Sequence, residues 1–453
     1  MRKPFVLVLP ILAILTTANA AESTAFVNVS VLPMTSETVL NHKTVIVSGG
    51  LISTIGDVAD TAIPEGARVV DGTDRYLMPG LSEMHGHIPG PSGDLDRVLT
   101  LYVANGITTV RGMLGRPEHL ALREAIDKGT VLGPRLYTSG PSFNGRSVNS
   151  VDGAVHMVDE QHAAGYDFLK IHPGLSRAEF DAIAETAARL QIPFAGHVPE
   201  DVGVDAALDA GIATIDHLDG YMETLLPPKV DPSGGFGGFF GVLLADAAEE
   251  SRIETIALAT AAAGVWLVPT ESLFEHALSA DDAGSMTKWP EMQYMPAATV
   301  EQWRAAKENL RRDVADKPGL VTRAIDLRHQ LILALHTAGA GFLLGADSPQ
   351  IFNVPGFAIH RELEFLVDAG LTPYAALRSG TANPAEFFAA TGRFGTVQAG
   401  LDADLLLLDA NPLEAISNTR RIHGVMLRGR WLDRRELDRL LGQYRREGLL
   451  SRR

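Results

Sequence analysis

The stretch Leu77–Gly90, LMPGLSEMHGHIPG, places two histidines one residue apart after a short apolar run. Side chains alternate along a strand, so His85 and His87 point the same way with Gly86 between them. Paired imidazoles suit zinc or a similar divalent metal. The stretch therefore predicts a strand that ends in half of a metal site, and the remaining ligands should follow other strands.

On the C-terminal side of this stretch, short apolar runs alternate with Ala-rich helical stretches such as 176–191 and 361–370. Eight strand-then-helix units predict an α/β fold, a (β/α)8 TIM barrel. A doubly wound open sheet is the alternative, but no G-x-G-x-x-G or phosphate loop supports it. After the first strand, the expected strands are ITTVRGM (107–113), RLYTSG (135–140), DFLKIHP (167–173), PFAGHVP (193–199), ATIDHLDG (213–220), VWLVPTES (265–272) and GFLLGADS (341–348).

Strand-like alternation also flanks the barrel on both sides. Residues 24–75 alternate, with Gly49-Gly50 as a turn signal, and strand patterns return at 395–413 and 424–433. We expect the two flanks to join in one small discontinuous β-sandwich domain. The predicted organisation is a signal peptide (1–20), the β-sandwich (22–76 and 391–432), the barrel (77–390) and a C-terminal helix (433–453).

The two insertions follow the sixth and seventh expected strands. Residues 230–250, VDPSGGFGGFFGVLLADAAEE, combine glycines with Phe and Leu anchors. That composition is typical of a mobile lid over an apolar site, and a surface loop is the alternative. A long helical insertion runs from about 276 to 330.

Composition limits the partners and the compartment. The formal net charge is −16, which argues against a nucleic-acid partner because phosphate binding needs clustered Lys and Arg. Arg2, Lys3, an apolar run too short to span a bilayer and Ala18-Asn19-Ala20 predict a cleaved secretory signal. No cysteine is present, which excludes disulfides, a lipid anchor on cysteine and a thiol nucleophile. We expect a periplasmic or secreted protein without a membrane span, with a homo-oligomer left open.

The other expected strands supply further ligand candidates. In a (β/α)8 barrel, the C-terminal ends of the strands meet at one mouth. Imidazole and carboxylate groups together suit divalent metals, zinc above all. With His85 and His87, the candidates are Lys170, His197, His217 and Asp347.

Lys170 is the unusual member of this set, because an ammonium group repels a cation. The conflict disappears if Lys170 reacts with carbon dioxide, since a carbamate is anionic and can bridge two metals. Burial near cations lowers an amine pKa and so favours the neutral form that carboxylation needs. Two divalent ions would then bind a bridging hydroxide, while Asp347 ligates one ion and transfers a proton to the leaving amine.

With these motifs the chain resembles the amidohydrolase superfamily, in its imidazolonepropionase-like and prolidase-like branch. The motifs are LMPGLSEMHGH, FLKIH, FAGHVP, TIDHLDG, LLGADS and the tail SGTANPAEFFAATGRFGTVQAGLDADLLLLDANP. The resemblance implies a binuclear metal centre, hydrolysis of an amide or ester-like bond, and ligands at His85, His87, Lys170, His197, His217 and Asp347. The Gly-rich run that follows the lysine strand in prolidase-like enzymes is absent here, where the sequence reads KIHPGLS, so a dipeptide substrate does not follow from the resemblance.

Three residues are candidates for substrate contact. His172 lies two residues past Lys170 on the same face, Arg111 lies near the end of the second strand, and Tyr221 resembles a carboxylate-binding tyrosine of related carboxypeptidases. The alternatives are a hydrogen bond to a metal ligand for His172, packing for Tyr221 and a salt bridge for Arg111.

The sequence therefore predicts a metal-dependent hydrolase that cleaves the C–N bond of a small substrate, such as a dipeptide or an N-acyl amino acid. The alternative is a hydrolase of cyclic amides, lactones or phosphotriesters that uses the same binuclear centre. A periplasmic metal- or ligand-binding protein that has kept the barrel without catalysis is the alternative from another class.

Overall fold

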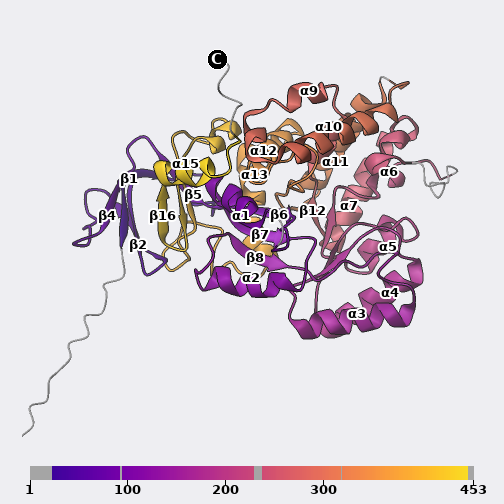
Figure 1. Cartoon of the computed structure of the whole chain (residues 1–453), viewed down its shortest axis with the longest axis horizontal. Coiled ribbons are helices and arrows are strands. Elements are labelled where there is room, and N and C mark those ends of the chain that lie inside the picture. The colour runs from indigo at the N-terminus through magenta and orange to yellow at the C-terminus, as the bar shows by residue number, and fades with distance from the viewer. Residues whose placement is uncertain (1–22, 92–93, 229–236, 318, 447–453) are drawn as a thin grey trace, which may run out of the picture.

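The computed structural model describes residues 23–91, 94–228, 237–317 and 319–446. The predicted signal peptide and part of the 230–250 insertion lie outside these ranges. Within the described ranges, no helix has the length and apolar character that a membrane span requires. Figure 1 shows a sheet-rich part on one side of the molecule and a larger part of strands surrounded by helices on the other.

The first part is an eight-stranded sheet built from both flanks of the chain, in the order β16-β15-β14-β5-β1-β2-β3, with β4 paired to β1. The junction between the flanks is the antiparallel pairing of β5 with β14. Its strands are β1 (Thr24–Val31), β2 (Leu40–Ser48), β3 (Leu51–Asp57), β4 (Arg68–Asp71), β5 (Tyr76–Pro79), β14 (Leu405–Leu408), β15 (Ile422–Leu427) and β16 (Arg430–Asp433).

This sheet folds back over itself. The rings of Phe26 in β1 and Trp431 in β16 meet edge to face, with their centroids 5.0 Å apart. Three strands lie between β1 and β16 in the sheet order, and neighbouring strands are spaced about 4.8 Å apart. A flat sheet would therefore hold the two rings far apart, so their contact encloses an apolar core between two layers.

The strand that leads to His85 and His87 begins later than residue 77, where the sequence pattern places its start. Residues 77–79 belong to β5 of the eight-stranded sheet, and the next strand, β6, runs from Leu81 to Gly86. Gly80 separates the two, because its N–H donates to the carbonyl of Asp404 and a Cβ there would lie 2.2 Å from Thr108 Cγ2. The chain passes from one sheet to the other at this glycine.

The second part contains two parallel sheets in sequential order, β6-β7-β8 and β9-β10-β11-β12-β13. Isolated parallel bridges, Ser139 with Phe168 and Gly86 with Ser348, connect them at their two outer edges. The mixed α/β class predicted from the sequence is confirmed. After β6, the strands are β7 (Ile107–Gly112), β8 (Arg135–Thr138), β9 (Leu169–Ile171), β10 (Phe194–Gly196), β11 (Thr214–Asp216), β12 (Trp266–Val268) and β13 (Gly341–Phe342).

Helices follow these strands and bury their apolar faces against them. In α4, Phe180, Ile183 and Ala187 form one buried stripe at helical spacing. The helices are α1 (Leu95–Ala104), α2 (Glu118–Asp127), α3 (Val151–Ala164), α4 (Arg177–Leu190), α5 (Gly203–Asp209), α6 (Tyr221–Thr224), α7 (Ile253–Ala263), α8 (Glu271–Leu278), α9 (Ala283–Met286), α10 (Ala297–Arg312), α11 (Leu320–Thr337), α12 (Phe357–Asp368), α13 (Pro373–Ser379), α14 (Ala382–Phe387) and α15 (Arg434–Gly442), with 3-10 segments that include η2 (Phe239–Ala247).

Candidate metal centre

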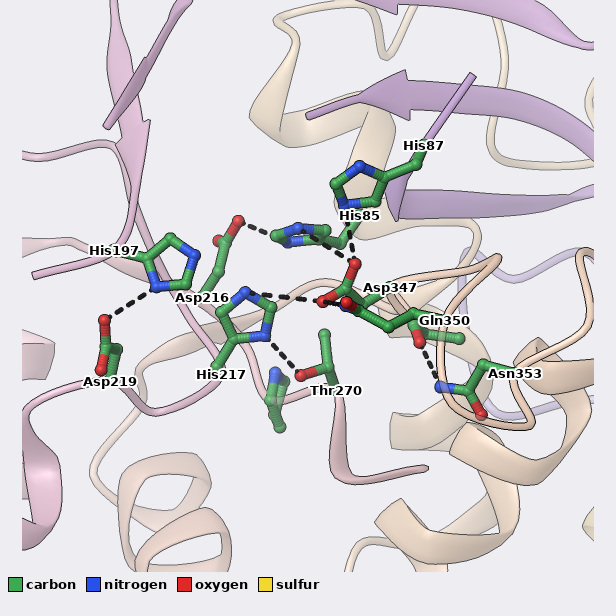
Figure 2. A network of polar contacts seen from close by, with 12 residues as sticks. His85, His87, His197, Asp216, His217, Asp219, Thr270, Asp347, Gln350 and Asn353 are labelled. Carbon is green, nitrogen blue, oxygen red and sulfur yellow. Dashed lines mark hydrogen bonds and ion pairs between the residues drawn. The ribbon is translucent and has the colours of Figure 1, made fainter. Parts of the chain in front are cut away.

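The strand ends bring histidines and a carboxylate together. Figure 2 shows the imidazoles of His85, His87 and His217 directed toward Asp347, with His197 beside His217. His87 Nε2 lies 2.7 Å from Asp347 Oδ1, and His85 Nε2 lies 3.7 Å from the same oxygen. His217 Nε2 lies 3.9 Å from Asp347 Oδ2. The ring centroids of His197 and His217 are 4.7 Å apart.

Local backbone geometry directs these side chains. His217 directly follows β11, and Asp347 lies five residues past the end of β13; both have left-handed backbones, with φ of 65° and 54°. Beneath the His-Gly-His turn, the buried carboxyl group of Glu83 accepts hydrogen bonds from the N–H groups of His85 (3.0 Å) and Ala346 (2.9 Å). Burial raises the pKa of Glu83 to about 8. This carboxyl group ties the end of β6 to the segment that carries Asp347.

Three imidazoles have a partner from outside the cluster beside Nδ1, as an ion-pair contact for His85 and as a hydrogen bond for His197 and His217. The distances from Nδ1 are 2.7 Å to Asp216 Oδ2 for His85, 2.9 Å to Asp219 Oδ2 for His197 and 2.7 Å to Thr270 Oγ1 for His217. Metal-binding histidines usually engage their second ring nitrogen in this way, which fixes the tautomer and the ring orientation. The Nε2 atoms are the ones left to hold a metal.

The sequence did not identify these orienting partners. Asp216 and Asp219 flank His217 in the motif TIDHLDG, so their proximity to a ligand candidate was a usable signal. Thr270 lies 53 positions from its histidine along the chain, and only the fold brings the two together.

Lys170 lies in the middle of β9 with its side chain fully buried. Its Nζ makes no hydrogen bond to any of the described residues. Burial lowers the pKa of Lys170 to about 8, although the carboxylates of Asp216 and Asp347 oppose that shift. Burying an amine without a hydrogen-bond partner costs folding free energy. A further group that binds Nζ would offset this cost.

The protonation states suit metal binding. Burial holds the pKa values of His85 and His217 well below the usual range, so both imidazoles are neutral at pH 7. Burial alone would raise the pKa of Asp347, but the adjacent His85 and His87 hold it well below its usual value. Candidate ligand atoms of His85, His87 and Asp347 all lie within 4.8 Å of one another. Imidazole nitrogens around an ionised carboxylate are a ligand set that fits a divalent cation of the zinc type.

His172 lies at the edge of this cluster. Its ring stacks on His197, with the centroids 5.0 Å apart and the planes inclined at 26°. The side chain is half-buried, and burial lowers its pKa. Substrate contact by His172 stays a prediction.

Arg111 lies beneath the cluster and does not reach its mouth. Its side chain is wholly buried, and Nη2 lies 3.3 Å from both carboxylate oxygens of Asp216. Its Nε donates to the carbonyl of Met84 (2.6 Å) and its Nη1 to Thr214 Oγ1 (3.1 Å). The substrate contact predicted for Arg111 therefore needs correction, because all three guanidinium nitrogens are bonded inside the strand layer. The structure supports the salt-bridge alternative.

Tyr221 also differs from its predicted role. It begins α6 with a fully buried side chain, and its hydroxyl group lies 2.9 Å from Thr260 Oγ1 in α7. The hydroxyl group thus joins two helices and is not available to a substrate carboxylate. Packing, the alternative interpretation, accounts for Tyr221.

Residues 76–432 match the Amidohydrolase family, and the chain belongs to that family. The resemblance seen in the motifs is confirmed, and so is the prediction that the chain is an amidohydrolase enzyme.

The individual relatives have low sequence identity to this chain. Ochratoxinase of Aspergillus niger is 24% identical over 426 residues, which cover 83% of this chain and 79% of that protein. The solved structure of bottromycin amidohydrolase matches with a TM-score of 0.70 at 22% identity, over 93% of this chain and 90% of the other. A Xaa-Pro dipeptidase with bound methionine in its active site matches with a TM-score of 0.66 at 18% identity, over 91% and 100%. These two structures show a shared fold.

Proposed function

We propose that this chain is a metal-dependent hydrolase that cleaves the amide C–N bond of a small substrate at a pair of divalent cations, with zinc as the expected metal. The observation that carries the proposal is the cluster of imidazoles whose Nδ1 atoms are occupied and whose Nε2 atoms are left beside Asp347 and the buried Lys170. His85, His87, Lys170, His197, His217 and Asp347 would hold the metals.

We propose further that the strands β6 to β13 form a closed (β/α)8 barrel. Their parallel, sequential order supports this architecture. So do hydrogen bonds at both outer edges of the two sheets, from Met84 N to Leu344 O (2.8 Å), from His87 N to Ser348 O (2.9 Å) and from Asp167 N to Thr138 O (3.0 Å). In such a barrel the strand ends named above lie at one mouth.

Carboxylation of Lys170 would complete the ligand set. The neutral amine attacks the carbon of carbon dioxide, a C–N bond forms as one C=O π bond opens onto oxygen, and the nitrogen releases a proton to water to give a carbamate anion. The lowered pKa of Lys170 increases the neutral fraction that can react. The anion would remove the mismatch between a cationic side chain and bound metal ions.

Asp347 would carry the proton during hydrolysis. When bound, the metal pair would polarise the substrate carbonyl group and lower the pKa of water. The carboxylate of Asp347, ionised and oriented by Gln350 Nε2 at 2.7 Å, would accept the proton of the attacking water and deliver it to the leaving amine. The names of two relatives, an amidohydrolase and a dipeptidase, favour an amide as the substrate class. Export to the periplasm or medium remains part of this proposal.

Chelation and metal rescue test the proposed function. Chelated protein should lose hydrolysis of dipeptides and N-acyl amino acids, and zinc should restore it. His85→Ala should abolish that rescue, while His156→Ala, a change at a highly exposed histidine, should leave it intact. Full activity of the metal-free protein would refute the proposal. Turnover of lactones or phosphotriesters without any amide cleavage would support the alternative substrate class.

A further inference from the structure

A phenylalanine from the 230–250 insertion lies against the imidazole cluster. The ring of Phe240 stacks on His217 with the centroids 4.8 Å apart and the planes inclined at 22°. It is also nearly parallel to His197, at 14° and 6.4 Å. Phe239 contacts Phe240 at 4.5 Å and Phe274 at 6.3 Å, so aromatic rings continue outward from the candidate metal ligands.

The segment that carries this ring is anchored. In η2, Val242 and Ala245 are buried, and the N–H of Leu243 donates to the carbonyl of Gly237 (2.9 Å). Gly241 approaches α6 so closely that a Cβ there would lie 2.5 Å from Met222 Cβ. The described part of the insertion is thus packed against its neighbours, and the residues before Gly237 take no part in this argument.

Phe240 itself has a left-handed backbone, with φ of 48°. This conformation is uncommon for residues other than glycine, and strained residues of this kind cluster at functional sites. Here the conformation accompanies a ring placed over two candidate metal ligands. A half-buried ring beside a polar centre offers a flat apolar wall that an aromatic group can stack on.

The open side of the centre lies near this wall. The side chain of His87 is 26% exposed and that of His197 is 13% exposed, while His85 and His217 are 1% exposed each. Of the two more exposed imidazoles, His197 is the one to which Phe240 is nearly parallel, so a substrate that enters along His197 would lie beside the phenylalanine. A ring attached close to the scissile bond would then contact the phenylalanine.

We propose that Phe240 is a specificity-determining residue that selects substrates with an aromatic ring, or another flat apolar group, next to the scissile amide. This inference rests on the proposed function and narrows its substrate class. It assigns Phe240 a contact with the non-reacting part of the substrate, and Phe240 takes no part in proton transfer.

The test compares substrates that carry an aromatic ring with matched substrates that carry an aliphatic group. The pairs are N-acetyl-phenylalanine with N-acetyl-leucine, and benzoyl-glycine with hexanoyl-glycine, so the ring lies on the amine side or on the acyl side of the amide. Phe240→Leu keeps an apolar side chain but removes the flat ring. It should lower kcat/KM for the ring member of at least one pair about 10-fold, the upper range for an aromatic contact, and change the chain member less than about 2-fold. Phe388→Leu, at a half-buried ring that stacks on Tyr137, is the matched control and should change neither.

A binding measurement separates this inference from the proposed function. Benzohydroxamate and hexanohydroxamate share a metal-chelating head, and calorimetry on zinc-loaded protein gives their affinities without turnover. A wild-type preference for the ring that Phe240→Leu removes, with zinc content unchanged, supports the inference even if no amide is hydrolysed. Equal losses for both compounds, no wild-type preference, no binding of either compound or loss of zinc from Phe240→Leu would each overturn it. Failure of the proposed function would instead appear as wild-type protein that hydrolyses none of the amides.

Discussion

The two ring nitrogens of His85 have different surroundings, and this difference extends inward through a buried chain of charges. Nδ1 meets Asp216, and Asp216 in turn meets Arg111, whose guanidinium group lies 5.6 Å from the ring of Phe168 and 5.4 Å from that of Phe387. Buried charges of this kind are stable only when they are paired. We therefore regard Arg111 as a positioning residue that acts on His85 through Asp216.

Asp216→Asn tests this chain. The amide is neutral and no longer fixes the imidazole tautomer, so metal affinity should fall about 10- to 100-fold. Competition with a chromophoric chelator measures the affinity, and Asp209→Asn at an exposed carboxylate of α5 is the control. Unchanged affinity in the first variant would show that Asp216 does not orient a ligand.

Lys170 provides the second prediction at this scale. Lys170→Ala removes the group that would become a carbamate, so bound metal and activity should both fall at least about 100-fold, as after loss of a ligand. Acetate or propionate can place a carboxylate in the vacated space and should restore part of both. The exposed Lys128 supplies the control, Lys128→Ala. Full metal content in Lys170→Ala would contradict a role as a ligand.

The sequence identified the residues that come together but not their orientation. His85 and His87 could be predicted because strand alternation and one intervening glycine fix their common direction. Arg111 and Tyr221 could not, since whether a side chain at a strand or helix end reaches the mouth depends on packing from distant segments. Arg111 donates to Asp216, which lies 105 positions away along the chain, and the hydroxyl group of Tyr221 contacts that of Thr260, 39 positions away.

At the scale of elements, α4 begins with a reciprocal cap that follows the strand of Lys170. The N–H of Ser176 donates to the carboxylate of Glu179 (2.9 Å), and the side chain of Ser176 accepts from the N–H of Glu179 (3.4 Å). A capping box of this kind satisfies two backbone donors that the helix cannot. It fixes where α4 starts and so where the loop after β9 ends.

Ser176→Ala should lower the free energy of unfolding by about 1 kcal/mol, because one of these donors loses its partner. Denaturant unfolding measures this loss. Ser176→Thr, which retains a capping oxygen, should lose less. Zinc affinity should stay unchanged in both variants. A loss of zinc-binding free energy larger than the loss of unfolding free energy would show that the cap supports the metal centre itself.

At the scale of the whole molecule, a buried ion pair joins the two parts. Arg135 of β8 is 3% exposed and lies 2.7 Å from Asp402 and 2.9 Å from Asp404, which precede β14 of the eight-stranded sheet. Burial alone would lower the pKa of Arg135, but the two carboxylates raise it. The contact links the parallel strands to the outer sheet in the interior of the protein.

Arg135→Met should therefore be strongly destabilising. It leaves the Asp404 carboxylate buried without its ion-pair partner, with only the hydrogen bond from the N–H of Arg428, which costs about 3–5 kcal/mol of unfolding free energy. The double variant Arg135→Met/Asp404→Asn should be less destabilised than the sum of the single changes. Arg68→Met breaks a more exposed pair with Asp433 and should cost less than about 1 kcal/mol. Denaturant unfolding measures both variants. Equal losses of unfolding free energy in Arg135→Met and Arg68→Met would argue against a stabilising role for the buried ion pair.

The architecture at this scale was partly readable from the sequence. Alternation in residues 24–75 identified strands, because the period of two survives in a half-buried sheet. Near residue 405 the signal was instead a short continuous apolar run, which is typical of a strand buried on both faces. The boundary at Gly80 could not be read, since the apolar run continues through it while the partner strands change. The packing of η2 over His197 and His217 could not be predicted from the sequence either, because it depends on the close approach of Gly241 to α6.

The pairing of β5 with β14 has a consequence during synthesis. β5 emerges from the ribosome early, but its neighbour around residue 405 is translated only after all the parallel strands. Until then β5 keeps an unpaired edge, the kind of surface on which nascent chains associate wrongly. The eight-stranded sheet is thus completed only late in synthesis, and β5 is the strand whose exposed backbone a chaperone would have to shield for longest.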